Sequence, residues 1–280
     1  MSHTVLLPHP ALDGAPLLVA HRGGSGLAPE NTLAAFLNGA ETWGADMMEL
    51  DVHASADGHC VVIHDPTVDR TTDGTGAVAS MPLARLRELD AGYRFTPDGA
   101  TYPYRGKGVG IATFDEVLEA LPAMRFTVEV KAGAAQPALF EAIQRFNARE
   151  RVIVAGMYEK DRTLFQDYRG AVSASAEELR RFYLRFRLGV GRFFPPRADV
   201  VQVPETWEGR RVVSPRFVRV LKRAGIPVHV WTVDDPDTMD RLLDWGVEGI
   251  ITDRPDVLGR VLHERTGRPL MPAHARTARE

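Results

Sequence analysis

The chain has 280 residues, of which 44% are hydrophobic and 25% are charged, and this is the composition of an ordinary globular protein. Its formal net charge is −3, so it lacks the overall positive field of nucleic-acid-binding proteins, and we predict no nucleic-acid partner. The single cysteine, Cys60, excludes a disulfide framework within the chain.

Short apolar runs of strand type alternate with helical patterns along most of the chain. In chain order, the predicted strands occupy residues 16–20, 46–52, 60–64, 125–131, 151–156, 171–175, 199–205, 227–233 and 249–253. The predicted helices occupy residues 31–44, 113–121, 136–149, about 159–168, 214–225 and 235–246. This alternation indicates a parallel sheet covered by helices, and the length fits a single α/β barrel of roughly 250 residues.

Two stretches break the regular alternation. Only a short turn containing Asp57 and Gly58 separates the strands at 46–52 and 60–64, which indicates a hairpin-like connection in place of a helical crossover. Nine strands are predicted, whereas a barrel of this class has eight, and the hairpin-like connection offers a reason for the extra strand. Residues 66–110 are rich in Gly, Pro and Thr, so we expect an insertion or a functional loop there.

Ionisable side chains gather at the ends of successive predicted strands. Each pair is explained in isolation by an ordinary structural role, but their shared position at one end of the sheet favours a site. Residues two apart on a strand face the same way, so Glu49 pairs with Asp51 and Glu129 with Lys131. The full set is His21 and Arg22, Glu49 and Asp51, His64 and Asp65, and Glu129 and Lys131.

The residue types in this set indicate phosphoryl chemistry at a divalent cation. Three carboxylates in a small volume repel one another unless a cation holds them, and oxygen ligands favour Mg²⁺ or Ca²⁺, or else Mn²⁺. Arg22 and Lys131 add positive charge for a phosphoryl group. His21 and His64 are candidates for general base and general acid, and the sequence leaves open which is which.

The blocks "HRG…PENT", "ELDV", "VVIHD", "EVK" and "VWTV…GIITDRP", from His21 to Pro255, resemble the glycerophosphodiester phosphodiesterases. The resemblance implies a distorted (β/α)8 TIM barrel with an insertion after the third strand, at about 66–110. It implies release of sn-glycerol 3-phosphate and an alcohol. By matching position, His21 and His64 are the acid/base pair, Glu49, Asp51 and Glu129 bind the metal, and Arg22, Lys131 and Trp231 contact the substrate.

Several questions stay open at this point. The family implies a cyclic phosphate formed by the glycerol 2-hydroxyl, whereas the residues alone also permit direct attack by water. Cleavage of lysophospholipids (lysophospholipase D) and a catalytically silent binding protein are the alternative functions. Relatives read "WTVN" where this chain has "WTVDD", so Asp234 either adds charge near the pocket or caps the next helix.

The remaining expectations concern surroundings and surface. We expect a single catalytic domain at 1–265 with a flexible polar tail at 266–280, and a cytoplasmic location because no leader or membrane span is evident. Segment 179–197 mixes arginine with aromatic residues. It is interpreted either as a patch for anionic lipid or as an outer barrel helix with its aromatics packed inward, and the second interpretation is favoured. The oligomeric state is not predicted.

Overall fold

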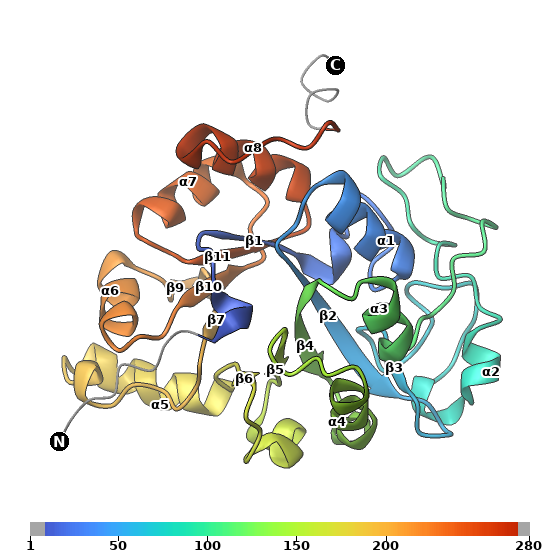
Figure 1. The fold of residues 1–280 in the computed structure, drawn as a ribbon, viewed down its shortest axis with the longest axis horizontal. Helices are drawn as coiled ribbons and strands as arrows, with labels where there is room; N and C mark the ends of the chain where they lie inside the picture. Colours follow the sequence, from blue (N-terminus) through green and yellow to red (C-terminus); the bar gives the residue numbers. More distant parts are fainter. Residues whose placement is uncertain (1–8, 274–280) are drawn as a thin grey trace.

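The computed structural model describes residues 9–273, and its centre is a curled sheet of mostly parallel strands surrounded by helices (Figure 1). Eight strands lie side by side in one path. In the order of their pairing these strands are β6 (Ala171–Val172), β5 (Val152–Ala155), β4 (Arg125–Val130), β2 (Met47–Ala54), β1 (Leu17–Ala20), β11 (Gly249–Thr252), β10 (Val228–Trp231) and β7 (Val201–Pro204).

The two ends of this path meet, so the sheet forms a barrel. A parallel bridge joins Ser173, just after β6, to Val200, just before β7. Two backbone hydrogen bonds support it, from the N–H of Asp199 to the carbonyl of Val172 (2.9 Å) and from the N–H of Ala174 to the carbonyl of Val200 (3.0 Å). The predicted α/β barrel is therefore confirmed.

The surplus strand is one arm of a hairpin. β3 (Cys60–Val62) lies off the barrel path and pairs antiparallel with the far end of β2, with Val52 opposite Val62. The turn between them contains Gly58 at φ +84°, a backbone conformation that glycine adopts without a steric penalty. The hairpin-like connection inferred from Asp57 and Gly58 is thus confirmed.

The helices begin where the sequence supplies capping side chains. Thr113 and Glu116 form a capping box at the start of α3, and Ser175 and Glu178 form another at α5. The helices are α1 (Leu33–Leu37), continued by a π-helical turn (Asn38–Thr42), α2 (Leu83–Leu86), α3 (Phe114–Ala120), α4 (Gln136–Arg145), α5 (Ala176–Arg187), α6 (Pro215–Arg223), α7 (Pro236–Asp244) and α8 (Pro255–Thr266). Short 3₁₀ turns occupy Pro10–Leu12, His21–Gly23, Val78–Ser80, Gly133–Ala135, Glu159–Phe165 and Gly191–Phe193.

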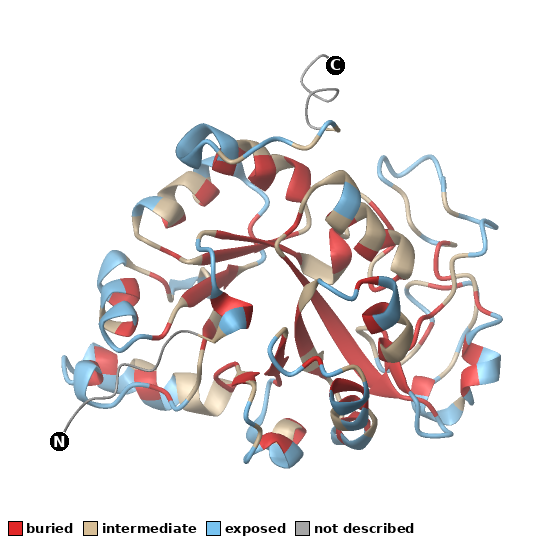
Figure 2. Cartoon of the chain, viewed as in Figure 1, coloured by how far each residue is buried: buried red, intermediate tan, exposed pale blue. Residues whose placement is uncertain are grey.

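Strand residues alternate between two apolar layers, and Figure 2 shows the strands buried while the outer helices expose one side. On β2, Met47 packs inside the barrel and Met48 packs outward under the helices. The 3₁₀ turn Pro10–Leu12 adds Ala11 and Leu12 to the inner cluster at the end where β4 begins, since Arg125 donates to the carbonyl of Asp13. The amino end of the barrel is therefore covered, and the opposite end carries the polar residues.

Three features differ from the predictions or extend them. Region 66–110 leaves the barrel between β3 and α3 and holds α2 with its own apolar cluster around Val68, Val78 and Leu86. The last helix, α8, and a small hairpin of β8 (Thr206–Trp207) and β9 (Arg210–Arg211) were not predicted. The start of the predicted tail is held, because Arg268 pairs with Asp46 at 2.5 Å. Residues 1–8 and 274–280 lie outside the described residues.

None of the helices in the described part of the chain combines the length and the apolar character needed to cross a lipid bilayer.

Candidate active site

The parallel register of β2 and β4 places three acidic residues together. Asp51 is the direct partner of Glu129 across these strands, and Glu49 lies two residues before Asp51 on the same face. Their carboxylate oxygens lie within 4.8 Å of one another, and Glu49 and Asp51 are buried. The sequence-based grouping of Glu49, Asp51 and Glu129 is therefore what the fold produces.

His21 enters the site from the end of β1. Ala20 pairs with Thr252 of β11, so the next residues, His21 and Asp253, leave their strands side by side. His21 Nδ1 lies 2.6 Å from Asp253 Oδ1, and His21 Nε2 lies 3.8 Å from Glu49 Oε2. A carboxylate at Nδ1 fixes the ring so that Nε2 points toward the acidic cluster.

His64 reaches the same region through the predicted hairpin-like connection. The sequence analysis grouped it with side chains at one end of the sheet, and β3 brings it there because it runs antiparallel to β2. β2 is eight residues long and extends beyond the pairing of Asp51 with Glu129, and β3 then returns along it. Since Ile63 N–H donates to the carbonyl of Asp51, His64 follows at the level of the cluster.

Asp65 is bonded to the neighbouring histidine. His64 Nδ1 lies 2.6 Å from Asp65 Oδ1, so Asp65 orients the ring as Asp253 orients His21. Arg70, from the region after β3, donates to Asp65 Oδ2 at 2.6 Å. The pKa of Asp65 is lowered to about 2, first by the hydrogen bond from Arg70 and then by that from His64, which together outweigh its partial burial.

Arg22 is held by a closed loop between residues 22 and 31. Its carbonyl accepts from the N–H of Asn31 at 3.0 Å, and both residues have left-handed backbones, with φ of +50° and +57°. Such strain is uncommon in non-glycine residues and is concentrated at functional sites. Within the loop, a Cβ on Gly23 would meet Ala35 Cβ at 2.8 Å, so a residue without a side chain is required there.

The cations of the site are each shared among carboxylates. Arg22 Nη1 lies 2.8 Å from Glu30 Oε1, and its Nε lies 3.2 Å from Asp51 Oδ2 outside hydrogen-bonding geometry. Lys131 Nζ lies 3.1 Å from Asp51 Oδ1 and 3.0 Å from Glu129 Oε2. Arg70 also bonds Glu30, at 2.6 and 2.7 Å. A continuous chain of ion pairs therefore joins His64 to the acidic cluster.

Burial makes the negative charge of the cluster costly. Burial and, after it, the nearby charge of Asp51 raise the pKa of Glu49 to about 7. Burial would also raise the pKa of Asp51, but Lys131, Arg22 and His64 outweigh it and lower that pKa. In the absence of a further cation, a proton on Glu49 therefore relieves the repulsion. A divalent ion would serve the same purpose, and the carboxylate oxygens of Glu49, Asp51 and Glu129 are the donors that Mg²⁺, Ca²⁺ and Mn²⁺ accept.

The pKa of His21 is set by competing effects. Burial lowers it, whereas the hydrogen bond to Asp253 and the charge of Glu49 raise it, and the net result lies above the ordinary value. Asp253 is itself secured by the Ser25 hydroxyl, which donates to the same oxygen. The imidazolium form of His21 is thus stabilised by Asp253 and Glu49.

Trp231 and Asp234 lie outside the acidic cluster, at the end of β10 and just after it. Trp231, at the end of β10, is half-buried against the apolar cluster inside the barrel, so it lies on the inward face as required for a substrate contact. Asp234 does not cap α7, because Asp235 does so by accepting from the N–H of Thr238. Instead, Asp234 Oδ1 accepts from the N–H of Asp253 at 2.8 Å and so anchors the partner of His21.

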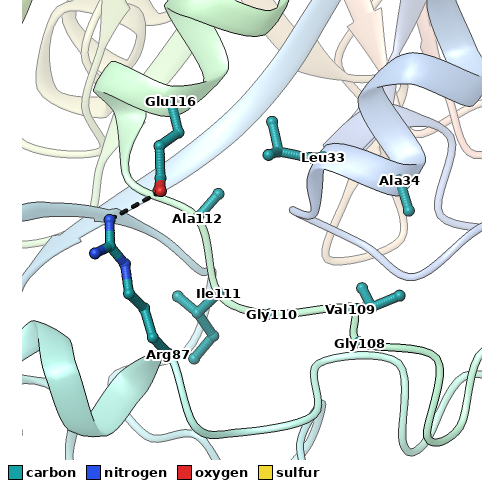
Figure 3. Close-up of a pocket in the computed structure, with 9 residues that line it drawn as sticks. All are labelled: Leu33, Ala34, Arg87, Gly108, Val109, Gly110, Ile111, Ala112 and Glu116. Carbon is teal, nitrogen blue, oxygen red and sulfur yellow. Dashed lines mark hydrogen bonds and ion pairs between the residues drawn. The ribbon is translucent and has the colours of Figure 1, made fainter.

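A separate hollow of about 370 Å³ lies between α1, α3 and the region before α3 (Figure 3). Leu33 and Ala34 form one wall, and Arg87 and Glu116 face each other across the opposite side at 2.8 Å. None of the residues that line it belongs to the acidic cluster or to the histidine pairs. Its one cation is already paired, so it lacks the free positive charge that a phosphoryl group needs.

Sequence reasoning missed Asp253, Ser25 and Arg70, and it gave no role to Glu30. Asp253 and Glu30 lie in the quoted blocks "GIITDRP" and "PENT", and an acid directly after a predicted barrel strand was the available signal for Asp253. Arg70 lies in the loop-rich region after β3, where no periodic pattern indicates a partner.

Comparison with known proteins places these observations in a family. The family model described as "Glycerophosphoryl diester phosphodiesterase family" matches residues 21–257. A glycerophosphodiester phosphodiesterase of Caldanaerobacter subterraneus is 35% identical over 257 residues, which cover 86% of this chain and 96% of that protein.

Solved structures agree with this result. A phosphodiesterase of Oleispira antarctica, solved in complex with the product sn-glycerol 3-phosphate, is 25% identical with a TM-score of 0.71, and the match covers 89% of this chain and 97% of that one. The glycerophosphoryl diester phosphodiesterase domain of an uncharacterised Mycobacterium tuberculosis protein has a TM-score of 0.79 at 23% identity, covering 88% and 99%, and it supports the fold.

Proposed function

Since the chain belongs to the glycerophosphoryl diester phosphodiesterase family, we propose that it hydrolyses glycerophosphodiesters to sn-glycerol 3-phosphate and an alcohol, with a divalent cation and two histidines. One observation carries the proposal. Two histidines, each held by a carboxylate at Nδ1, flank a buried acidic cluster that Arg22 and Lys131 border. That arrangement suits a phosphodiester, which needs charge neutralisation and two proton transfers.

Glu49, Asp51 and Glu129 would hold the cation, because their oxygens converge and because the raised pKa of Glu49 indicates a deficit of positive charge. When bound, the ion stabilises negative charge on the phosphoryl oxygens. We propose Mg²⁺ or Ca²⁺, or else Mn²⁺, since all three accept an all-oxygen ligand set.

The cationic side chains would bind and orient the phosphoryl group. Arg22 lies beside the acidic cluster, with its Nε 3.2 Å from Asp51 Oδ2, so its positive charge would favour an anionic oxygen there. Lys131 contributes a positive charge between Asp51 and Glu129. Trp231, which packs against the apolar cluster inside the barrel, would contact the glycerol or head-group portion.

The histidines would move the protons. One takes the proton of the glycerol 2-hydroxyl as that oxygen attacks phosphorus, and the other protonates the departing alcohol. The cyclic phosphate formed in this way would be opened by water in a second step, in which the two histidines exchange roles. Asp253 and Asp65 hold the rings in the tautomer that presents Nε2 to the substrate.

The test is one assay with glycerophosphocholine and lysophosphatidylcholine as alternative substrates. The protein is stripped with EDTA, and Mg²⁺, Ca²⁺ or Mn²⁺ is then restored. We expect metal-dependent release of choline and sn-glycerol 3-phosphate from glycerophosphocholine. Turnover of lysophosphatidylcholine alone would replace the proposed substrate class, and undiminished activity in EDTA would refute the metal site.

Matched variants separate the histidines from general effects on the protein. His21→Ala and His64→Ala should each lower kcat by roughly 10²- to 10⁴-fold, the range typical of general acid–base catalysis. His59→Ala is the control, because His59 is exposed in the β2–β3 turn and its imidazole lies 3.9 Å from the carboxylate of Asp57, away from the site. Full activity of either site variant would remove that histidine from the proposed pair.

We further propose that residues 1–265 act as one catalytic unit with 66–110 as its insertion. The contacts of Arg70 with Asp65 and Glu30 support this, because they tie the insertion to the site.

A further inference from the structure

The surface formed by the end of α5 and the segment after it combines exposed apolar side chains with arginines. Leu184 is 64% exposed, Leu188 71%, Phe193 62% and Phe194 51%. We call this surface the arginine–aromatic face, and it consists of Arg180, Arg181, Leu184, Arg185, Arg187, Leu188, Val190, Arg192, Phe193, Phe194 and Arg197. Large apolar side chains grouped in this way on a protein surface mark an interaction site more often than isolated ones do.

Inward packing accounts for only part of the segment. Phe182 and Phe186 are buried, and their rings lie 5.8 and 5.6 Å from the ring of Phe217 on α6. This is what the favoured packing interpretation requires of them. It leaves the opposite side of α5 unexplained, where Leu184 and Leu188 lie one turn apart and point to solvent. Figure 2 shows this outer side of α5 as exposed.

The charge of the face is of one sign. Residues 179–197 contain six arginines and no acidic residue, in a chain whose net charge is −3. Arg181 pairs with Glu159. Within residues 9–273, Arg180, Arg185, Arg187, Arg192 and Arg197 form no ion pair, and all of them are exposed. An anionic partner would therefore meet positive charge that the protein itself leaves uncompensated.

Arginine and phenylalanine are interleaved rather than separated on this face. The guanidinium of Arg185 lies 5.1 Å from the ring centre of Phe194, and that of Arg192 lies 4.5 Å from the ring centre of Phe193. Arg181, Arg185 and Arg197 also line a hollow of about 260 Å³ beside Phe194, in which the acidic lining residue, Glu178, is paired with Arg162. An occupant must thus present anionic groups and apolar groups within a few ångströms of each other.

The positive charge and the exposed apolar side chains of this face distinguish among three possible binding partners. A second copy of the chain would bring the same arginines into opposition, which like-charge repulsion disfavours. A nucleic acid offers phosphates but gains little from exposed leucines. We propose that the arginine–aromatic face docks on an anionic lipid surface, with its arginines at the phosphates and Leu184, Leu188, Phe193 and Phe194 inserted among the acyl chains.

This docking is separate from the proposed hydrolysis. α5 starts after the carboxyl end of β6 and runs back, and the chain re-enters the sheet at the beginning of β7, at Val201. The end of α5 and the segment after it, with Leu188, Phe193 and Phe194, therefore lie toward the amino end of the barrel, whereas the acidic cluster lies toward the carboxyl end. Binding to lipid can be measured without turnover, so its failure and the failure of the proposed function are distinguishable.

The test is co-sedimentation of the full chain with phosphatidylcholine vesicles, with or without about one third phosphatidylglycerol, at low and high salt. We expect binding to the anionic vesicles only, weakened by salt. Arg187→Gln/Arg192→Gln should weaken it by about 10- to 30-fold, since each arginine near an anionic surface contributes about fivefold. Phe193→Ser/Phe194→Ser should weaken it by about tenfold or more through loss of insertion.

The control is Arg85→Gln/Arg210→Gln, which removes the same charge from exposed positions outside the face. It should bind as the unaltered chain does, and all variants should keep the glycerophosphocholine activity, which reports that they are folded. Absence of binding to anionic vesicles at low salt overturns the proposal, and so does equal binding to neutral vesicles. A dimer that Phe193→Ser/Phe194→Ser dissociates, without any vesicle binding, would assign the face to a second copy instead.

Discussion

Metal binding by the cluster of Glu49, Asp51 and Glu129 should be coupled to the release of a proton near neutral pH. Burial and the charge of Asp51 raise the pKa of Glu49 to about 7, so the metal-free protein holds a proton on Glu49 below that pH. A cation binds the ionised carboxylate, so the proton must leave first. The affinity for metal should therefore rise with pH and level off above the pKa of Glu49.

The size of the change in metal affinity with pH follows from the pKa of Glu49. With a pKa of about 7, roughly one tenth of the Glu49 carboxyls are ionised at pH 6 and roughly nine tenths at pH 8, so the affinity should increase by about tenfold. Protonation of His21, 3.8 Å from Glu49, acts in the same direction because a second positive charge opposes the cation. About tenfold is thus a lower bound for the change.

Isothermal titration calorimetry with Mn²⁺ at pH 6, 7 and 8 measures this change directly. Pairs of buffers with different ionisation enthalpies report the protons released on binding. Glu49→Gln is the matched control, since it keeps the shape of the side chain and removes the titrating group, so most of the pH dependence should vanish. Equal affinity at pH 6 and pH 8 in the unaltered protein, or no proton release at pH 6, would refute the reasoning.

Three further predictions concern other parts of the fold. Asp253→Asn should lower kcat by roughly 10²- to 10⁴-fold with little change in KM and shift the pH–rate profile, because His21 loses the partner that orients and charges it; an unchanged profile would contradict this. Gly23→Ala should cost about 2–4 kcal/mol in urea unfolding, since Gly23 has φ +88° and the new Cβ would lie 2.8 Å from Ala35 Cβ. His229 is buried on β10 with a pKa lowered to about 4 by burial, so between pH 4 and its ordinary value of 6.5 the unfolded chain binds the extra proton and stability falls as the pH drops. His229→Leu should remove about 3 kcal/mol of that dependence, and identical pH profiles of unfolding free energy for both proteins would sink this account.

The acidic cluster could be predicted because it depends on local geometry. The spacing of two between Glu49 and Asp51 fixes their common face in any strand, and parallel pairing with β4 needs only one register to bring Glu129 beside them. The hairpin that carries His64 was also predicted, from the short turn at Asp57 and Gly58, but the extension of β2 to Ala54, along which β3 returns, was not. Local rules therefore predicted the shared face and the reversal of the chain, whereas the length of the paired strands depends on pairing and not on the apolar pattern.

Local sequence rules could not predict contacts between residues that only the closure of the barrel brings together. His21 and Asp253 are 232 positions apart in the sequence, and only the pairing of β1 with β11 brings them together. α8 was not predicted, although the sequence carries a helical pattern there. Pro255 suits a first helical turn, and Val257, Leu258, Val261 and Leu262 recur at helical spacing.

Each of the two histidines is bonded to an aspartate, but the two aspartates differ in their other hydrogen-bond partners. Asp65 accepts from His64 and also from Arg70, so much of its negative charge is neutralised by a permanent cation. Asp253 accepts from His21 and from the neutral hydroxyl of Ser25, so more of its charge acts on the imidazole. The raised pKa of His21 is consistent with that difference. In the proposed mechanism, the proton-donating role in the first step is therefore assigned to His21, and the proton-accepting role to His64, whose carboxylate is shared with Arg70.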